Sequence, residues 1–357
     1  PFHNYLKDLG AVFGELAGYE RANWFSNLNQ KPEYQYSWGK QNWFENQKKE
    51  HTAVRQNIGI FDMSSFGKIR VDGEGALNFL QEICTAQINI QIGKIVYTQM
   101  LNEKGGIESD LTISRLGEKS FLLVVPCATL QRDLSYLNRK NNSNEVIIID
   151  ISSSEGVLSI MGPNSRKLLE CVSPNNFCNS AHPFGTWKNI EIGSGLARAH
   201  RVSYVGELGW EIYISSDQCA HVFEEIWKFQ KEMKFNLCGI HALDSCRIEK
   251  AYRHFGHDIT DEDHIVDAGL SFTADLSKKN FEGKESILNK RKVGSSKKML
   301  QFKLNDPSKM IYHNEPVLRD HKIVGYLTSG NFGHTLGGCI GLGYVDSKNL
   351  SNEEILS

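Results

Sequence analysis

Asp110 is the residue of this chain whose type and position best suit chemistry, because it follows a pair of glycines. Adjacent glycines accept the positive φ that tight hairpin turns require, so Gly105-Gly106 predicts such a turn. The alternating run 111–114 predicts an outgoing strand with Asp110 at its start, where a carboxylate is held in a fixed position for a ligand. By the same alternation, Glu108 would point to the same side. A solvent-exposed acidic hairpin is the alternative that this motif leaves open.

A second acidic residue, Glu211, follows a predicted hairpin turn at 206–209. If this turn forms, Tyr204 ends the incoming strand and Glu211 starts the returning one, so both side chains point toward the same end of the sheet. A carboxylate that accepts two N–H donors suits a guanidine-like ring edge, as in pterins and guanine. A glutamate that faces solvent is the alternative.

Arg247 lies in a helix that we expect from about 240 to 255. Spacings of three and four residues place it on the same apolar stripe as Leu243. A buried arginine without a partner is strongly destabilising, so this side chain needs a carboxylate. A structural ion pair with Glu211 or Asp244 and an anchor for a bound carboxylate or polar heterocycle are equal alternatives.

The sequence does not indicate a metal site or a dinucleotide site. His254 and His257 are three residues apart, but the intervening glycine breaks a helix, which favours a structural or ligand-facing role. The motif Gly73-Glu74-Gly75 lacks the third glycine of a dinucleotide loop and favours a strand-to-helix turn. No two cysteines form a CxxC pair, so neither a zinc ribbon nor a dithiol redox site is expected, and a reducing compartment fits best.

The bulk properties argue against two classes of partner. The 357 residues carry a formal net charge of −2, which gives no general argument for binding nucleic acid or an anionic membrane. No apolar run approaches the length of a membrane span. The chain begins at Pro1 without a methionine, so we expect it to be part of a longer polypeptide, although an experimentally shortened chain would look the same.

The periodicities predict an α+β chain in three parts. Residues 1–50 are rich in aromatic and amide side chains, and we expect an irregular arm that wraps over another surface. Strand and helix patterns alternate over 51–290. After a linker at 292–298, short strands separated by glycine turns predict a small β-barrel over 298–357.

Several motifs together resemble the folate-binding aminomethyltransferase family, whose founding activity belongs to the glycine cleavage system. The resemblance covers nearly all of residues 50–346. The segments that carry it are Phe61–Ser65 with Gly67-Lys68, Asn102–Asp110, Met161–Arg166, Gly206–Glu211, Asp244–Lys250, Gly256–Asp258, and Thr328–Gly330 with Gly343–Val345. It implies a three-lobed fold of α/β and barrel units around a central folate channel.

Further motifs resemble one branch of this family, the folate domains of dimethylglycine and sarcosine dehydrogenases. These motifs are Gly10–Glu15, Glu20–Phe25, Tyr97–Asn102 and Arg253–Asp258. The resemblance implies that a flavin domain precedes this chain in the full polypeptide and that residues 1–50 link the two. FAD would bind only to that absent domain. It also implies that the closing strands of the barrel are cut off after Ser357.

The resemblance implies a site for tetrahydrofolate. Carried over position by position, four residues match folate contacts or the buried arginine of that site: Tyr97, Tyr204, Glu211 and Arg247. Asp110 matches the carboxylate beside the reacting folate nitrogens. The stand-alone enzymes carry two adjacent acids, and here Ser109 replaces the first, so Asp110 is the one expected to act.

The implied activity is capture of the carbon of an oxidised N-methyl amine as 5,10-methylenetetrahydrofolate, in a bacterial cytoplasm or a mitochondrial matrix. Asp110 would accept the nitrogen proton that is lost as the folate ring closes, or would stabilise the iminium. Three alternatives stay open: a stand-alone aminomethyltransferase of the glycine cleavage type, a non-catalytic folate-binding module, and a structural domain that mediates oligomerisation of the flavoenzyme.

Overall fold

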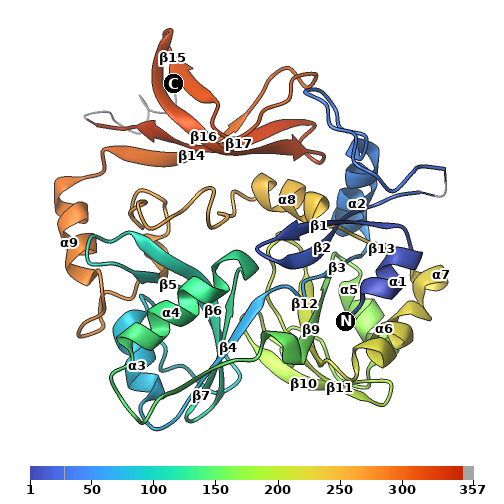
Figure 1. Cartoon of the computed structure of the whole chain (residues 1–357), viewed down its shortest axis with the longest axis horizontal. Coiled ribbons are helices and arrows are strands. Elements are labelled where there is room, and N and C mark those ends of the chain that lie inside the picture. The colour runs from blue at the N-terminus through green and yellow to red at the C-terminus, as the bar shows by residue number, and fades with distance from the viewer. Residues whose placement is uncertain (28, 349–357) are drawn as a thin grey trace.

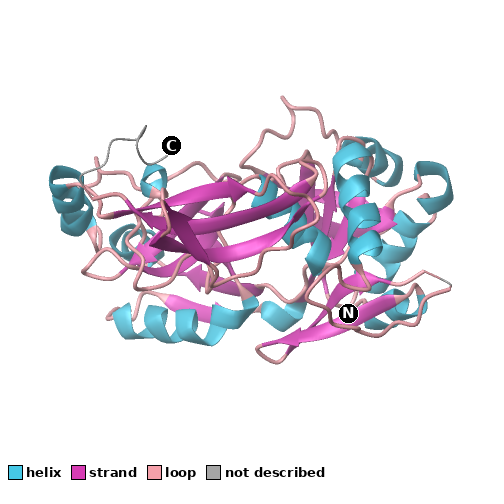
Figure 2. Cartoon of the chain, turned by 90° about the horizontal axis from the view of Figure 1, so that it is seen from above, coloured by secondary structure: helices cyan, strands magenta, loops and turns pink. Residues whose placement is uncertain are grey.

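The computed structural model describes residues 1–27 and 29–348 as three lobes, each built on one large β-sheet. In Figure 1 the five-stranded sheet lies at lower left, the six-stranded sheet at lower right, and the C-terminal four-stranded sheet above both. Seen from above in Figure 2, helices lie toward the outer edges and strands cross the middle. The expected α+β fold in three lobes is therefore confirmed. Residues 349–357, the end of the predicted barrel segment 298–357, lie outside the described residues.

The three sheets are composed of strands from separate stretches of the chain. The five-stranded sheet has the order β5-β6-β7-β4-β8, with β4 (Gly67–Asp72), β5 (Ile95–Leu101), β6 (Ile107–Gly117), β7 (Ser120–Val125) and β8 (Ile147–Asp150). The six-stranded sheet has the order β10-β11-β12-β9-β3-β13, with β3 (Gly59–Asp62), β9 (Glu155–Met161), β10 (Trp187–Ile192), β11 (Gly195–His200), β12 (Gly209–Ser215) and β13 (Asn236–Leu237). The C-terminal sheet has the order β14-β17-β16-β15, with β14 (Lys297–Lys303), β15 (Pro316–Arg319), β16 (Lys322–Gly333) and β17 (Gly338–Asp346).

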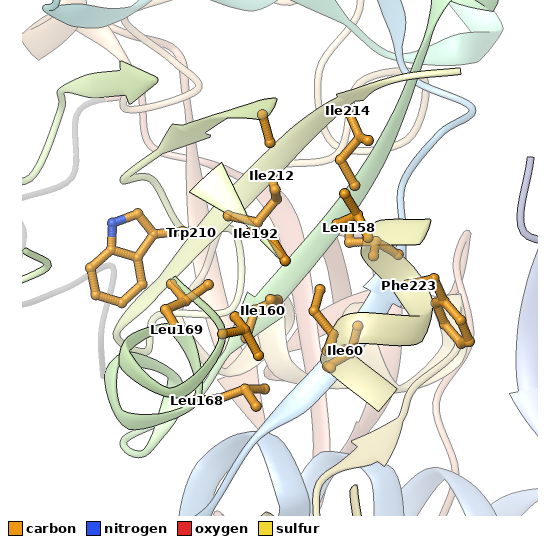
Figure 3. Close-up of a cluster of buried hydrophobic side chains, with 14 of the residues drawn as sticks. Ile60, Leu158, Ile160, Leu168, Leu169, Ile192, Trp210, Ile212, Ile214 and Phe223 are labelled. Carbon is orange, nitrogen blue, oxygen red and sulfur yellow. The ribbon is translucent and has the colours of Figure 1, made fainter. Parts of the chain in front are cut away.

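Helices cover the outer faces of the two larger sheets. On the five-stranded sheet, α3 (Ala76–Ile83) and α4 (Leu130–Lys140) bury their apolar faces. On the six-stranded sheet, α5 (Ser165–Val172) and α6 (Cys219–Trp227) do the same, and Figure 3 shows Leu168 and Phe223 beside isoleucines of the strands. The other α-helices are α1 (His3–Asp8), α2 (Phe44–Gln56), α7 (Gln230–Met233), α8 (Ile240–Glu249) and α9 (Lys284–Val293). Within the described ranges, none of the helices has both the length and the apolar character that a membrane crossing needs.

The inner faces of the two larger sheets share a third buried cluster. Phe61 of β3 and Val157 of β9 pack there with Leu122 and Val124 of β7. Removing these side chains from water stabilises each by roughly 1.5–3 kcal/mol. The cluster holds the two sheets face to face, so polar residues on these inner faces are enclosed between the lobes.

Strand register aims two predicted site residues into this interior. On β6, Thr112 lies opposite Val124 of β7, so Thr112 and, two residues earlier, Asp110 face inward. On β12, Ile212 packs in the outer core, and the neighbouring Glu211 therefore faces inward.

The first 50 residues are more regular than the irregular arm expected from their composition. β1 (Ala11–Leu16) and β2 (Tyr19–Phe25) form an antiparallel hairpin, with α1 before it and the start of α2 after it. Phe2 and Ala22 are buried in the outer core of the six-stranded sheet. The expectation of an irregular arm is wrong for these elements. Ala22 and Trp24 are buried at alternate positions of β2, a strand pattern that the many aromatic residues of this segment obscure in the sequence. The predicted domain boundaries at 50 and 290 stay predictions.

Two expected elements near the site also differ from the structure. α8 ends at Glu249 and does not reach 255, because Ala251 takes a left-handed φ of 53° and turns the chain away. β11 ends at His200, so Tyr204 lies in the loop to β12 and does not end a strand. A third difference is β14, whose start within the predicted linker 292–298 was not expected.

The two glycines of the β5–β6 turn serve different purposes. Gly105 takes the left-handed φ of 80° that the turn requires. Gly106 allows a close backbone approach, since a Cβ there would lie 1.9 Å from the carbonyl oxygen of Asp261. The amide of Ile265 donates to the carbonyl of Gly105 (3.1 Å), and that of Ile107 donates to the carbonyl of Thr260 (3.2 Å). The turn therefore fixes the hairpin that carries Asp110 against the segment after α8.

We predict that Gly106→Ala lowers the free energy of unfolding by about 2 kcal/mol or more, because backbone must shift to admit the methyl group. Chemical denaturation measures this change. Gly39→Ala is the matched control, because Gly39 has no positive φ and its nearest neighbour, the hydroxyl oxygen of Ser37, is 3.7 Å from the added Cβ. Equal stability of the two variants would contradict the close approach at Gly106.

Candidate active site

Asp110 is held by neutral hydrogen-bond donors from the neighbouring strand. Gln99 of β5 lies directly opposite it, and its Nε2 donates to Oδ1 of Asp110 at 2.7 Å. The hydroxyl of Thr273 donates to Oε1 of Gln99, which orients the amide so that its N–H groups face Asp110. The hydroxyl of Tyr97 also lies close enough to Asp110 to favour its ionised form. The carboxylate is therefore fixed in position without a salt bridge to any residue that the structure describes.

Burial raises the pKa of Asp110 to about 6, although the hydrogen bonds from Tyr97 and Gln99 and the charge of Arg253 favour the ionised form. At neutral pH the Asp110 side chain is mostly ionised, yet it binds a proton far more readily than an exposed aspartate does. Such a group suits general acid–base chemistry near neutral pH.

Two tyrosines flank this carboxylate. Tyr97 is 38% exposed, and burial together with the neighbouring Asp110 raises its pKa well above the usual value, so it stays a hydrogen-bond donor. Tyr204 donates its hydroxyl to the backbone carbonyl of Arg253 at 2.6 Å and stacks on Tyr252, with ring centroids 5.9 Å apart. Asp110 raises the pKa of both tyrosines, and Tyr204 contributes to the raised pKa of Tyr97. The structure thus brings three of the predicted site residues together.

Glu211 faces the same interior from β12. Its side chain is 9% exposed, and its Oε2 accepts a hydrogen bond from the hydroxyl of Tyr213 at 2.8 Å. Burial raises the pKa of Glu211 to about 7, with Tyr213 as the one opposing group. On the neighbouring strand β11, His200 lies directly opposite Glu211. Among the described residues Tyr213 is its hydrogen-bond partner, so the buried carboxyl keeps capacity to accept from a ligand.

Arg247 belongs to a buried ion-pair network. Its Nε donates to Asp244 at 2.7 Å, and its Nη1 donates to Asp258 at 2.6 Å and to the carbonyl of Tyr252 at 3.0 Å. Its Nη2 donates to the hydroxyl of Ser329 at 2.9 Å. Of the two ion pairs that the sequence left open, the one with Asp244 is present, and Glu211 has no ion pair among the described residues. Whether Arg247 also contacts folate stays a prediction.

This network fastens the C-terminal sheet to the rest of the chain. Asp258 is fully buried and accepts hydrogen bonds from the hydroxyls of Thr328 (2.5 Å) and Ser329 (2.7 Å), both on β16. On β17, the hydroxyl of Tyr344 donates to the carbonyl of Asp258 at 3.0 Å. The segment after α8 therefore lies between the C-terminal sheet and the β5–β6 hairpin, and connects both to the site.

The neighbours of Asp110 on β6 lie elsewhere. Ser109 is buried, and because side chains alternate along β6, it points to the opposite face of the sheet from Asp110. Glu108 sits at a register shift between β5 and β6 and pairs with Arg132 of α4 at 2.6 Å. Because a bulge interrupts alternation, the expectation that Glu108 faces the same side as Asp110 does not follow from strand geometry.

Sequence reasoning overlooked two residues of this site, Gln99 and Arg253. Gln99 opposes Asp110 only because of the register shift beside Glu108, which a count across the glycine turn does not reveal. Arg253 follows the unexpected end of α8 and reaches Asp110 and Tyr97 electrostatically. Its place in a helix predicted to continue to 255 gave no signal of such a role.

The histidines noted in the sequence do not make a metal site in the described part of the chain. The rings of His254 and His257 are 4.8 Å apart, centre to centre, and His313 follows at 6.2 Å from His257. No group of three or more histidine, cysteine or acidic residues within the described ranges has the arrangement of metal ligands.

Comparison with protein families gives two matches that together span most of the chain. Residues 2–278 match the GCVT N-terminal domain, and residues 297–356 match the glycine cleavage T-protein C-terminal barrel domain.

Three curated relatives illustrate the range of similar proteins. A 4-methylaminobutanoate oxidase (formaldehyde-forming) of Paenarthrobacter nicotinovorans is 40% identical over 97% of this chain and 42% of its own length. Mitochondrial sarcosine dehydrogenase of Homo sapiens is 31% identical over the same two shares, 97% and 42%. An aminomethyltransferase of Halothermothrix orenii is 35% identical over 83% of this chain and 82% of its own length. The chain thus spans less than half the length of the oxidase and the dehydrogenase.

A solved structure has the same overall fold. The crystal structure of the glycine cleavage system aminomethyltransferase T from Bartonella henselae superposes with a TM-score of 0.83 and 25% identity, covering 98% of this chain and 90% of that one.

We predict that Asp258→Asn lowers the free energy of unfolding by about 3 kcal/mol or more, because it removes one of the two carboxylates that neutralise buried Arg247. Chemical denaturation of the variant measures the change. Asp8→Asn, at an exposed position at the end of α1, is the control and should stay within about 0.5 kcal/mol of the unaltered chain. A similar small effect at both positions would show that the buried network contributes little.

Proposed function

Because the chain belongs to the glycine cleavage T-protein family of folate-dependent aminomethyltransferases, we propose that it binds tetrahydrofolate and helps to load a one-carbon unit onto it. The observation that carries this proposal is Asp110, a carboxyl group with a pKa of about 6. Neutral donors hold it beside the partly accessible rings of Tyr97 and Tyr204.

The finer proposal is that the chain is the folate module of a dimethylglycine or sarcosine dehydrogenase-like enzyme. Support comes from the oxidase and dehydrogenase relatives, which match 97% of this chain and extend well beyond the matched part. A flavin domain in the same polypeptide would oxidise an N-methyl amine and hold the FAD. This module would then capture the released carbon as 5,10-methylenetetrahydrofolate, in a bacterial cytoplasm or a mitochondrial matrix.

A stand-alone aminomethyltransferase of the glycine cleavage type is the second candidate. The aminomethyltransferase of Halothermothrix orenii favours it, since this chain matches 82% of the length of that enzyme. The two candidates share the folate site and differ in the donor of the one-carbon unit.

The residues present are suited to a pterin. Within the described ranges, the buried carboxyl group of Glu211 has one hydrogen-bond donor, Tyr213, so it needs either a proton or N–H donors from a ligand. The amino group and ring N–H of a pterin supply two such donors side by side. We propose that Glu211 orients the pterin and that Tyr204 contacts it as a flat apolar surface with a polar tip.

Arg247 has a mainly positioning role in this proposal. Four of its N–H groups donate to Asp244, Asp258, Ser329 and the carbonyl of Tyr252, and a guanidinium carries five. The fifth N–H has no acceptor among the residues that the structure describes and is left for a folate contact. The other four fix α8 and the turn that follows it, which holds the hydroxyl of Tyr204 through the carbonyl of Arg253.

Asp110 is the proposed base. Tetrahydrofolate, when bound, supplies the two nitrogen nucleophiles N5 and N10 between which the carbon is held. One of these nitrogens must lose a proton, and Asp110 can accept it because its pKa of about 6 lies close to neutral pH. Tyr97 and Gln99 keep the carboxylate in place while it exchanges the proton.

We predict that Asp110→Asn slows formation of methylenetetrahydrofolate by about 10²–10⁴-fold at saturating folate, because the amide cannot accept the proton. The measurement is the initial rate above the uncatalysed background. Folate affinity, measured by calorimetric titration, should change far less than the rate, since other residues bind the pterin.

The control for this experiment is Glu108→Gln, which removes a carboxylate from the same strand and leaves Asp110 intact. Because Glu108 pairs with Arg132 and not with the site, its variant should keep the full rate. An unchanged rate in Asp110→Asn, or an equal loss in both variants, would overturn the assignment of Asp110 as the base.

A further inference from the structure

Arg253 is an arginine of the site whose charge is not neutralised by a salt bridge within the described part of the chain. Its side chain forms no salt bridge with any described carboxylate, in contrast to Arg247 six residues earlier. Its charge nevertheless reaches Asp110 and Tyr97, where it favours the ionised form of each group. A cation in this position can attract an anionic group of a ligand.

The backbone holds this guanidinium in one place. Its Nε donates to the carbonyl of Ala268 at 3.0 Å, and its Nη1 donates to the carbonyl of Ala251 at 2.6 Å. Neutral carbonyls fix the group without cancelling its charge. Both Nη2 N–H groups and one on Nη1 have no acceptor among the described residues.

Two residues in left-handed conformations make this arrangement possible. Ala251 has φ 53°, which a residue with a side chain rarely adopts, and its carbonyl is one of the two acceptors. Gly269 has φ 68°, and a Cβ there would lie 2.9 Å from Nη2 of Arg253. The backbone around the guanidinium is therefore strained at Ala251, and the absence of a side chain at Gly269 leaves room for Nη2.

We propose that the free N–H groups of Arg253 bind a carboxylate of a ligand that lies beside Asp110 and Tyr97. The planar guanidinium is suited to this because it can hold both carboxylate oxygens at once. This proposal rests on the proposed folate function and assigns a specificity residue to the same site. It makes the site selective for ligands that carry a carboxylate.

This carboxylate has two sources, the glutamyl group of tetrahydrofolate and a methylated amino acid that delivers the carbon. The first source predicts that Arg253 discriminates between tetrahydrofolate and tetrahydropteroate, which has the same rings without the glutamate. The second predicts that the folate-loaded chain binds sarcosine, which carries a carboxylate, but not dimethylamine, which does not.

The test is a binding cycle on the 357-residue chain by calorimetric titration under anaerobic conditions. If the glutamyl group is the source, the unaltered chain binds tetrahydropteroate about 10–100-fold more weakly than tetrahydrofolate, the usual range for a hydrogen-bonded charge. Arg253→Gln should weaken tetrahydrofolate by a similar factor and leave tetrahydropteroate unchanged. Arg139→Gln, an exposed arginine on α4, is the control with the same change of charge.

The second arm titrates the tetrahydropteroate-loaded chain with sarcosine and with dimethylamine. Sarcosine binding that disappears in Arg253→Gln assigns the carboxylate to the methylated amino acid. If Arg253→Gln binds tetrahydrofolate, tetrahydropteroate and sarcosine with the same affinities as the unaltered chain, the proposal is overturned. If the unaltered chain binds tetrahydrofolate and tetrahydropteroate equally and does not bind sarcosine, only the role of Arg253 fails, whereas no binding of either pteridine overturns the proposed function itself.

Arg253→Lys guards against loss of fold, since Arg253→Gln removes the hydrogen bonds to Ala251 and Ala268. The lysine keeps the charge without the planar fork, so it should show part of the discrimination between the two ligands. Unchanged tetrahydropteroate affinity in either variant reports an intact site. If Arg253→Gln still prefers tetrahydrofolate over tetrahydropteroate as strongly as the unaltered chain does, the carboxylate is bound elsewhere.

Discussion

The burial of carboxyl groups between two packed sheets is the constraint on which the rest of this structure depends. Asp244 is paired with Arg247, and its pKa is lowered although burial acts in the opposite direction. Among the described residues, the hydrogen-bond donors to Asp110 and Glu211 are neutral, and burial raises the pKa values of these two groups to about 6 and about 7. The first kind of acid holds the fold together, and the second kind remains ready to exchange a proton or to meet a ligand.

A raised pKa alone does not identify the site. Glu50 has a pKa of about 8, raised by burial, yet its two oxygens accept the backbone N–H groups of Phe25 and Gly239 and join β2 to α8. Asp110 differs because it faces the interior between the sheets, next to a tyrosine that stays partly accessible. Because Asp110 lies on this inner face, its readily gained proton can be exchanged with a ligand. The ion-pair network of Arg247 and Asp258 then holds the C-terminal sheet over the same region.

The sequence predicted what depends on local chemistry and alternation. The sequence predicts Asp110 on a strand after a glycine turn, and the structure has it on β6. The packing of the sheets adds that Asp110 and Glu211 both face inward. Gln99 could not be found in the same way, because the register shift beside Glu108 changes which residue of β5 opposes Asp110. Arg253 was hidden by the left-handed Ala251, since an alanine gives no sign that a helix ends. Long-range packing decided both positions, and a single sequence does not record it.

The central claim is that the protein holds Asp110 as a poised base. The most direct test is a pH titration of this carboxyl group by ¹³C NMR on aspartate-labelled protein, with the signal assigned by its loss in Asp110→Asn. The account predicts an apparent pKa near 6 in the chain without folate. A pKa at or below about 4, the range of an exposed aspartate, would contradict it.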